Sequence, residues 1–249
     1  MSEAWSPFGY IVTNLARFIR PHEVTFSGVN STLPMLACLL AKRAYPFEFT
    51  YINVAGGVDP VPSAIPISSS DPVLAEGSAS IFANEDFYDL CTRGRMDLCF
   101  LGAAQVDGQG QTNVSCIGDW HHPKVRLPGG GGGAVMLPTA RRAVTWRTEH
   151  SRRTMVEKLD FLTAAGGMHG VVTPIAVFVQ RDGRLALQSW HPQSSLDEVR
   201  ARTAFAFDST GAAPTPPPTP EEAAALRALD PDGRFERDAG IVLRKEAAA

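Results

Sequence analysis

The chain has 249 residues and a formal net charge of -3, with 44% hydrophobic and 20% charged residues. This composition is that of an ordinary globular protein, long enough for one large domain or two small ones. Acidic and basic residues are interspersed, so the charge does not support binding to nucleic acid or an anionic membrane surface. No apolar run approaches the roughly 20 residues that span a bilayer, and MSEAWSPFGY at the N-terminus does not resemble a signal peptide.

The first hundred residues alternate between helical and strand-like patterns. Helices are predicted over 9–20, over 31–45 after a possible N-cap at Ser31 or Thr32, and over 81–94, where Gly94 ends the helix. Strands are predicted over 23–28, 47–57 and 96–107. Because strands alternate with helices, this part of the chain favours a parallel sheet.

The later half is richer in strands. DGQG at 107–110 predicts a hairpin turn, and the apolar runs around Arg181, Asp182 and Gly183 predict a second hairpin. Further strands are predicted over 133–138, 143–149, 171–192 and 201–208. The proline-rich stretch 211–220 predicts an extended connector to a short helix. We therefore predict an α/β fold with an open, mostly parallel sheet and flanking helices over residues 1–210, followed by a connector and C-terminal helix over 211–249.

The four cysteines, Cys38, Cys91, Cys99 and Cys116, lie far apart and form no CxxC pair. This spacing does not favour a zinc site, and we expect no metal. We interpret the cysteines as reduced thiols, most of them in the core, of a cytoplasmic protein.

Turn-forming segments follow the first three predicted strands: SGVNSTLP, NVAGGVDP and GAAQVDGQGQ. Parallel sheets bind ligands at the edge where their strands end. For one such turn, glycine and asparagine are explained by the positive φ angles that they adopt. Three of them beside a run of five glycines favour close approach of the backbone to a ligand.

The glycine run, Gly129 to Gly133, has three possible explanations. Strand-like sequence on both sides argues against a solvated linker. A P-loop phosphate site would need a Lys-Ser or Lys-Thr pair, which is missing. The third explanation is a backbone surface that donates N–H groups to an oxyanion or lies against an acyl thioester and its pantetheine arm. We favour this one.

Three stretches carry a family resemblance: FSGVNSTLPMLACLLAKR, VEKLDFLTAAG and, above all, FLGAAQVDGQGQTNVSCIGDWHHPKVRLPGGGGGA. They resemble the β subunits of family I CoA-transferases, in particular the glutaconate CoA-transferase-like group. The resemblance covers roughly residues 9–200 and is most specific over 100–166. It implies a CoA-transferase-like α/β fold, an α subunit in a heteromer such as α2β2, and an active site at their interface. It also implies an acyl-CoA substrate, often of a dicarboxylic acid, with coenzyme A as part of the substrate and no separate cofactor.

The sequence departs from the family at the nucleophile. In these transferases a Glu after the second strand attacks the thioester. Counting back from Asp71-Pro72, which match the family's downstream Asp-Pro pair, places Val54 at that position, beside Asn53. Valine cannot be a nucleophile. A shift of one or two residues does not restore an acid, because NVAGG contains none.

Other reactive side chains have ordinary explanations. We interpret Glu76 as a surface carboxylate, Asp107 as a turn residue and Cys116 as a core residue. His121 and His122 are expected to face solvent or a partner, although one of them could face the ligand. None stands where the family has its nucleophile.

Two groups of relatives lack this Glu. One resembles the 3-methylglutaconyl-CoA decarboxylase of an alternative isovaleryl-CoA pathway, and the other the ring-opening hydrolases of steroid breakdown, whose catalytic Glu is on the α subunit. GAAQVDGQGQTN and HHPKVRLPGG are closer to the glutaconate type, which favours the decarboxylase. CoA transfer with a nucleophile from elsewhere and a purely structural subunit remain alternatives.

The site residues predicted on this basis form two groups. The positions expected at the reacting group are Val54, Asn53, Gly131 and Gly132. The positions expected to bind substrate or CoA are Gly28, Val29, Asn30, Gln105, Gly129, Gly130 and Gly133.

Overall fold

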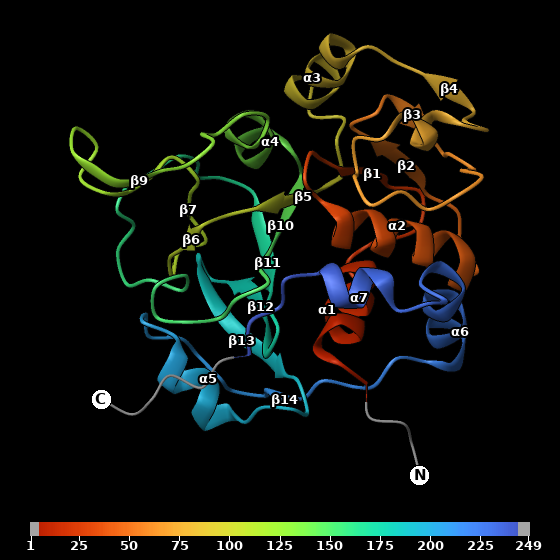
Figure 1. Ribbon diagram of the computed structural model, residues 1–249. Coiled ribbons are helices and arrows are strands. Elements are labelled where there is room, and N and C mark those ends of the chain that lie inside the picture. Colours follow the sequence, from red (N-terminus) through yellow and green to blue (C-terminus); the bar gives the residue numbers. More distant parts are fainter. Residues whose placement is uncertain (1–4, 244–249) are drawn as a thin grey trace.

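The computed structural model describes residues 5–243 of the chain. Within these residues, a ten-stranded sheet runs through the molecule and carries helices on both faces (Figure 1). In spatial order its strands are β14 (Ala213–Pro214), β13 (Arg184–Trp190), β12 (Ala176–Arg181), β11 (Met168–Val172), β10 (Arg142–Trp146), β5 (Leu98–Gly102), β1 (Val24–Ser27), β2 (Thr50–Asn53), β3 (Gly57–Val58) and β4 (Ser80–Ile81). The central strands from β11 to β2 are parallel to one another. The predicted open, mostly parallel sheet is thus confirmed.

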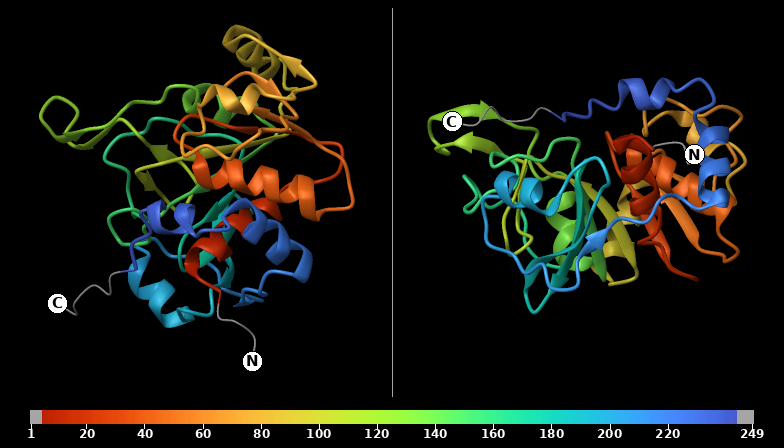
Figure 2. Two further views of the ribbon diagram at one scale, coloured as in Figure 1. Left: turned by 45° about the vertical axis from the view of Figure 1, so that its right-hand side comes forward. Right: turned by 90° about the horizontal axis from the view of Figure 1, so that it is seen from below.

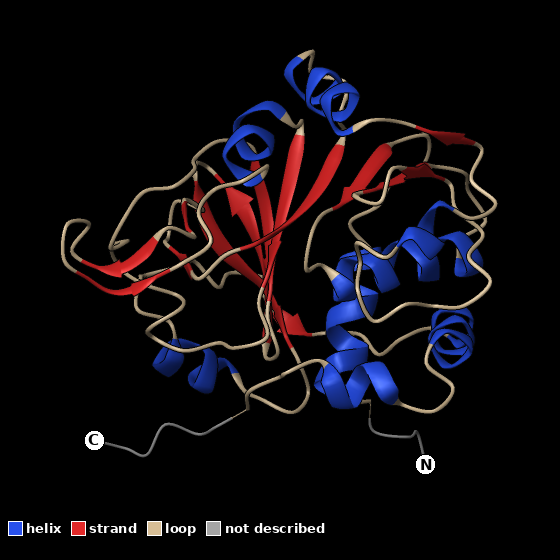
Figure 3. Ribbon diagram, turned by 45° about the horizontal axis from the view of Figure 1, so that its top comes forward, coloured by secondary structure: helices blue, strands red, loops and turns tan. Residues whose placement is uncertain are grey.

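Two groups of helices cover the sheet (Figure 3). α1 (Pro7–Ala16), α2 (Thr32–Ala44), α6 (Pro220–Leu229) and α7 (Arg234–Asp238) contribute to the hydrophobic core on one face. α3 (Asn84–Thr92), α4 (Gly133–Thr139) and α5 (Leu196–Arg202) contribute to the core on the other face. A short 3-10 helix spans Pro72–Ala75.

Strand β5 lies between these two cores. Leu98 and Phe100 belong to the first core, whereas Cys99 and Leu101 belong to the second. A strand covered on both faces needs apolar residues at every position, because successive side chains point to opposite sides. This explains why the sequence here is a continuous apolar run instead of an alternating one.

The strand predicted over 133–138 is wrong, because these residues form helix α4. A run of six apolar residues fits a buried helix turn as well as a buried strand. In the fold, Met136 and Leu137 are buried in the second core, and the Leu137 carbonyl accepts a hydrogen bond from the Gly167 amide at 2.7 Å.

The strand predicted over 201–208 is also wrong. Helix α5 extends to Arg202, and an irregular segment follows. The alternating aromatic residues that suggested a strand, Phe205 and Phe207, both pack edge-on against Phe178. Their spacing therefore reflects attachment of a loop to the core.

The predicted strand over 96–107 divides into two. β5 ends at Gly102, and Gln105–Val106 forms β6, which pairs with β7 (Thr112–Asn113) outside the large sheet. The hairpin predicted at DGQG is therefore confirmed. The β12–β13 hairpin is confirmed too, with φ of 48° at Asp182 and 78° at Gly183, as a tight two-residue turn requires.

A second ribbon, β8 (Cys116–Gly118) with β9 (Pro123–Arg126), projects from the body of the molecule as an arm (Figure 2). Trp120 at its tip stacks on Phe161, with ring centroids 4.4 Å apart, and the Arg126 guanidinium lies over the same indole. These contacts hold the arm against the loop that contains Phe161.

The four cysteines are buried and unbridged, which confirms their interpretation as core residues. Within residues 5–243, no helix is both long enough and apolar enough to cross a membrane.

The C-terminal segment packs back onto the main body of the chain. β14 pairs with β13, α6 packs on α2, and Arg234 donates a hydrogen bond to the Ile65 carbonyl. The boundary at residue 210 stays a prediction.

Glu222 anchors α6. Its carboxylate accepts hydrogen bonds from Arg17 Nη2 at 2.7 Å and Tyr45 Oη at 2.9 Å, and it caps the helix through the Thr219 amide. Burial alone would raise the pKa of Glu222, but the hydrogen bonds from Arg17, Thr219 and Tyr45 outweigh it and lower the pKa. Its contribution to stability is therefore present at neutral pH and lost as the pH falls through this lowered value.

Glu222→Ala should lower the free energy of unfolding by about 3 kcal/mol at neutral pH, because partly buried Arg17, Tyr45 and the Thr219 amide all lose the buried carboxylate that accepts their hydrogen bonds. Urea denaturation measures this change. The exposed pair Arg93–Asp89, 2.9 Å apart, provides the control, and Asp89→Ala should cost about 0.5 kcal/mol or less. The difference in the free energy of unfolding between Glu222→Ala and the parent should become smaller as the pH falls. A difference that stays constant down to about pH 3 would contradict this assignment.

Candidate functional site

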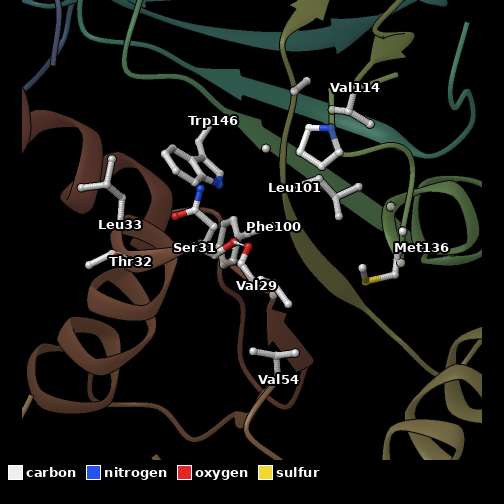
Figure 4. Close-up of a pocket in the computed structure, with 18 of the residues that line it drawn as sticks. Val29, Ser31, Thr32, Leu33, Val54, Phe100, Leu101, Val114, Met136 and Trp146 are labelled. Carbon is white, nitrogen blue, oxygen red and sulfur yellow. Dashed lines mark hydrogen bonds between the residues drawn. The ribbon is translucent and has the colours of Figure 1, made fainter. Parts of the chain in front are cut away.

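A cavity of about 730 Å³ lies at the carboxyl edge of the parallel strands β2, β1, β5 and β10 (Figure 4). Val54 follows β2, Gly28 and Val29 follow β1, Gly102 ends β5, and Trp146 ends β10. Because the strands are parallel and adjacent, the residues that follow them meet at one edge. The predicted location of the site at this edge agrees with the cavity.

The turn after β1 forms one wall. Asn30 adopts a left-handed conformation with φ of 52°, which asparagine tolerates better than most residues. Buried Ser69 holds the turn from outside: its hydroxyl accepts a hydrogen bond from the Ser31 amide and donates one to the Gly28 carbonyl, both at 2.9 Å. Gly28, Val29 and Asn30 line the cavity, and their binding of substrate or CoA stays a prediction. The role of Ser69 gave no sequence signal.

Val54 lines the cavity from the next strand, whereas its neighbour Asn53 does not. The Asn53 side chain is fully buried and bonds its own loop: it donates to the carbonyls of Gly57 and Leu74 and accepts from the Ala55 amide. Asn53 therefore shapes the turn that presents Val54, and its side chain is not directed at a ligand.

The glycine run forms a third wall, and all five residues, Gly129 to Gly133, line the cavity. Gly129 and Gly131 have φ of 93° and 47°, and a Cβ on either would extend into open space. Glycine is therefore needed at these two positions for its backbone conformation. Gly133 begins α4, so the run is an ordered lead into a helix.

The amides of this loop are available to a ligand. Gly129 N–H donates to the Val114 carbonyl at 2.8 Å. Within the described part of the chain, the N–H groups of Gly130 to Gly133 donate to no protein acceptor. The loop can therefore offer several backbone donors to one oxygen-rich group.

Gln105 lies outside the cavity. Its side-chain amide donates to Asp160 Oδ2 at 3.0 Å, and its carbonyl oxygen accepts from Asn113 Nδ2 at 2.7 Å. Asp160 also accepts from the Gly118 amide. Gln105 is thus committed to a network that ties the β6–β7 hairpin to the base of the arm.

The other reactive side chains considered from the sequence also lie outside the cavity. Asp107 accepts hydrogen bonds from the amides of Gln109 and Gln111, as a turn residue does. Cys116 is buried, and His121 and His122 are exposed. Glu76 is exposed, and the hydrogen bond from Ser63 lowers the pKa of its carboxyl group.

Sequence reasoning missed two charged residues of the cavity, Arg147 and Asp238. Arg147 directly follows β10, so a charged residue after a buried strand was the available signal. Asp238 lies on α7, a helix whose place beside the cavity depends on packing far along the chain. Among the described lining residues, Arg147 is the one cation and Asp238 the one carboxylate.

The coenzyme A transferase family model matches residues 10–201 of the chain. The chain is 30% identical to the B subunit of the 3-oxoadipate CoA-transferase of Pseudomonas knackmussii, over 91% of its length and 94% of that protein. It is 27% identical to the B subunit of the glutaconate CoA-transferase of Acidaminococcus fermentans, over 89% of its length and 91% of that protein.

Among solved structures, the decarboxylase AibA/AibB matches with a TM-score of 0.87 and 32% identity, covering 95% of this chain and 98% of that one. A variant of that decarboxylase in which a cysteine is replaced by valine matches with a TM-score of 0.86 and 33% identity, covering 95% and 99%. The chain therefore belongs to the coenzyme A transferase family, as a β subunit of family I.

Proposed function

We propose that this chain is the β subunit of a heteromeric acyl-CoA enzyme that removes CO2 from a glutaconyl-type thioester, such as 3-methylglutaconyl-CoA, instead of transferring CoA. The observation that carries this proposal is the pairing of Val54 with a glycine loop in one cavity. An apolar residue stands at the position of the transferase nucleophile, and backbone amides without protein acceptors in the described chain line the same cavity.

Decarboxylation fits this pairing because it needs no nucleophile. When the carbon–carbon bond to the carboxylate breaks, its electron pair spreads through the double bond onto the thioester oxygen as a dienolate. A proton then completes the shortened acyl-CoA. The protein must stabilise the negative oxygen, and the available amides of Gly130 to Gly133 are donors of the required kind.

The apolar side of the cavity serves the same reaction. Val54, Leu101, Val114 and Met136 line it, as Figure 4 shows. Such a surface excludes water from the reacting group.

The comparison with the decarboxylase AibA/AibB supports the same reaction. This chain is 32% identical to that decarboxylase over 95% of its length, with a TM-score of 0.87.

CoA transfer is the second candidate. The curated relatives are named CoA-transferases. In addition, one carboxylate of this chain, Asp238, lines the cavity and could take the place of the missing Glu as a nucleophile.

We further propose that the chain works with an α-type subunit, as an α2β2 assembly in the cytoplasm, with no cofactor apart from the coenzyme A of its substrate. Both curated relatives are named as the B subunits of their enzymes. The arm and the loop beside it expose Trp120, Val125 and Leu162, each more than 40% accessible. Apolar side chains exposed together are typical of a surface that a partner covers.

Incubation of the co-purified heteromer with 3-methylglutaconyl-CoA and free acetate should yield CO2 and a CoA ester one carboxyl group shorter, without acetyl-CoA. Mass spectrometry of the CoA esters distinguishes decarboxylation, which gives the shorter ester, from CoA transfer, which gives acetyl-CoA. Asp238→Asn should keep this activity, and hydroxylamine should trap no acyl adduct on this chain. Formation of acetyl-CoA that is lost in Asp238→Asn would instead establish CoA transfer.

Gly131→Val should lower turnover about 100-fold, because the added methyl groups enter the space next to the amides that stabilise the oxyanion. The left-handed backbone adds a stability cost of roughly 1–2 kcal/mol. Gly94→Val is the matched control: Gly94 has φ of 66°, a Cβ there meets open space, and it lies outside the cavity. Both variants should lose similar stability in thermal unfolding, and only Gly131→Val should lose turnover. Near-normal turnover of Gly131→Val would mean that the loop does not serve catalysis.

A further inference from the structure

Arg147 is a cation in the wall of the cavity. Its Nη1 donates to the Ala103 carbonyl, while its Nε is buried and has no acceptor in the described chain. Within residues 5–243, no carboxylate lies within ion-pair distance of its guanidinium. The carboxylate of Glu149, two residues along the chain, accepts a hydrogen bond from the Ser151 hydroxyl at 2.8 Å.

Arg147 is half-buried, and the two arginines of the described chain that are fully buried, Arg142 and Arg202, are both paired. Arg142 Nη2 lies 2.7 Å from Glu23 Oε1, and Arg202 Nη1 lies 3.1 Å from Glu198 Oε1. Arg17, partly buried, is paired with Glu222 at 2.7 Å. Arg147 has no carboxylate partner among the described residues, and its side chain borders the cavity.

An unpaired buried charge is costly, because the protein does not replace the water that the charge loses. Burial lowers the pKa of Arg147, although the charge of Glu149 acts in the opposite direction. A guanidinium nevertheless stays protonated at neutral pH. The cavity therefore holds a positive charge that a bound anion would neutralise.

The strand order indicates which part of a bound acyl-CoA would contact Arg147. Val54 follows β2 and Arg147 follows β10, with β1 and β5 between them. At about 4.8 Å per strand, the two backbones lie roughly 14 Å apart. If the thioester lies beside Val54, a five-carbon acyl chain extended along the sheet edge brings its far end towards the Arg147 side chain.

We propose that Arg147 binds the carboxylate at the far end of the acyl chain and thereby selects dicarboxylic over monocarboxylic acyl-CoA esters. This assignment rests on the proposed function in taking an acyl-CoA as the ligand, with its thioester beside Val54. Arg147 is then a specificity-determining residue. The negative charge that develops on the thioester oxygen is stabilised by the amides of the glycine loop, and not by Arg147.

This role has a kinetic signature that a purely structural role lacks. A cation at the carboxylate stabilises the bound substrate more than the transition state, because negative charge leaves that carboxylate during the reaction. Loss of the cation should therefore raise KM and leave kcat unchanged or higher. If Arg147 instead stabilised the thioester oxygen, its loss would lower kcat.

The first experiment measures binding by calorimetry, with the protein in the assembly in which it purifies. The probes are glutaryl-CoA, its ω-methyl ester, butyryl-CoA and CoA. The parent should bind glutaryl-CoA at least roughly tenfold more tightly than its methyl ester, as the loss of one charge-assisted contact predicts. Equal affinity for glutaryl-CoA and the ester would overturn the assignment without any variant.

The variants complete the test. Arg147→Gln should bind glutaryl-CoA and its methyl ester alike and keep the parent's affinity for butyryl-CoA, and Arg147→Lys should restore part of the preference. An equal loss of affinity for all four probes would place Arg147 at the CoA phosphates and refute the proposal. Because binding is measured without turnover, a failure to detect CO2 would count against the proposed reaction and not against this carboxylate site.

Discussion

The alignment of four parallel strands is the constraint on which the rest of the structure depends. Pairing of β2 with β1, β1 with β5 and β5 with β10 brings the ends of all four strands to one edge. The residues after each strand are then neighbours although they are far apart in sequence. Val54 and Arg147 share a cavity for this reason, with no direct pairing between their own strands.

The same pairing accounts for the two cores. Side chains of the central strands alternate between the α1–α2 face and the α3–α4 face, and both faces are covered. Covering both faces fixes each strand in its register, because a shift of one residue would exchange every side chain between the cores. The register in turn sets how far each strand extends towards the cavity.

Sequence patterns were reliable where local and tertiary preferences agree. The helix at 31–45 and the hairpin at Asp182-Gly183 depend on apolar periodicity and turn geometry, which are properties of short segments. The patterns failed where packing decides. The apolar run at 133–138 became a helix, and the aromatic alternation at 201–208 belongs to a loop held by Phe178. For the site, the residues that could be predicted are those whose type is unusual for their position, such as five glycines in succession or a valine where the family resemblance leads one to expect an acid. Asn53 and Gln105 were less predictable, because a buried amide near a turn can face either a ligand or the backbone. Arg147 was missed because its lack of an ion-pair partner among the described residues is visible only once the fold is known.

Helix α7 and the residue after it contribute Phe235, Asp238 and Ala239 to a cavity otherwise built from residues 26–164. During synthesis the strands that surround the cavity therefore leave the ribosome well before its last wall does. A nascent chain can form the sheet, yet its pocket stays open on one side until residue 239 has emerged. A chain that ends before α7 would lack this wall of the pocket and also the core contacts of Phe235.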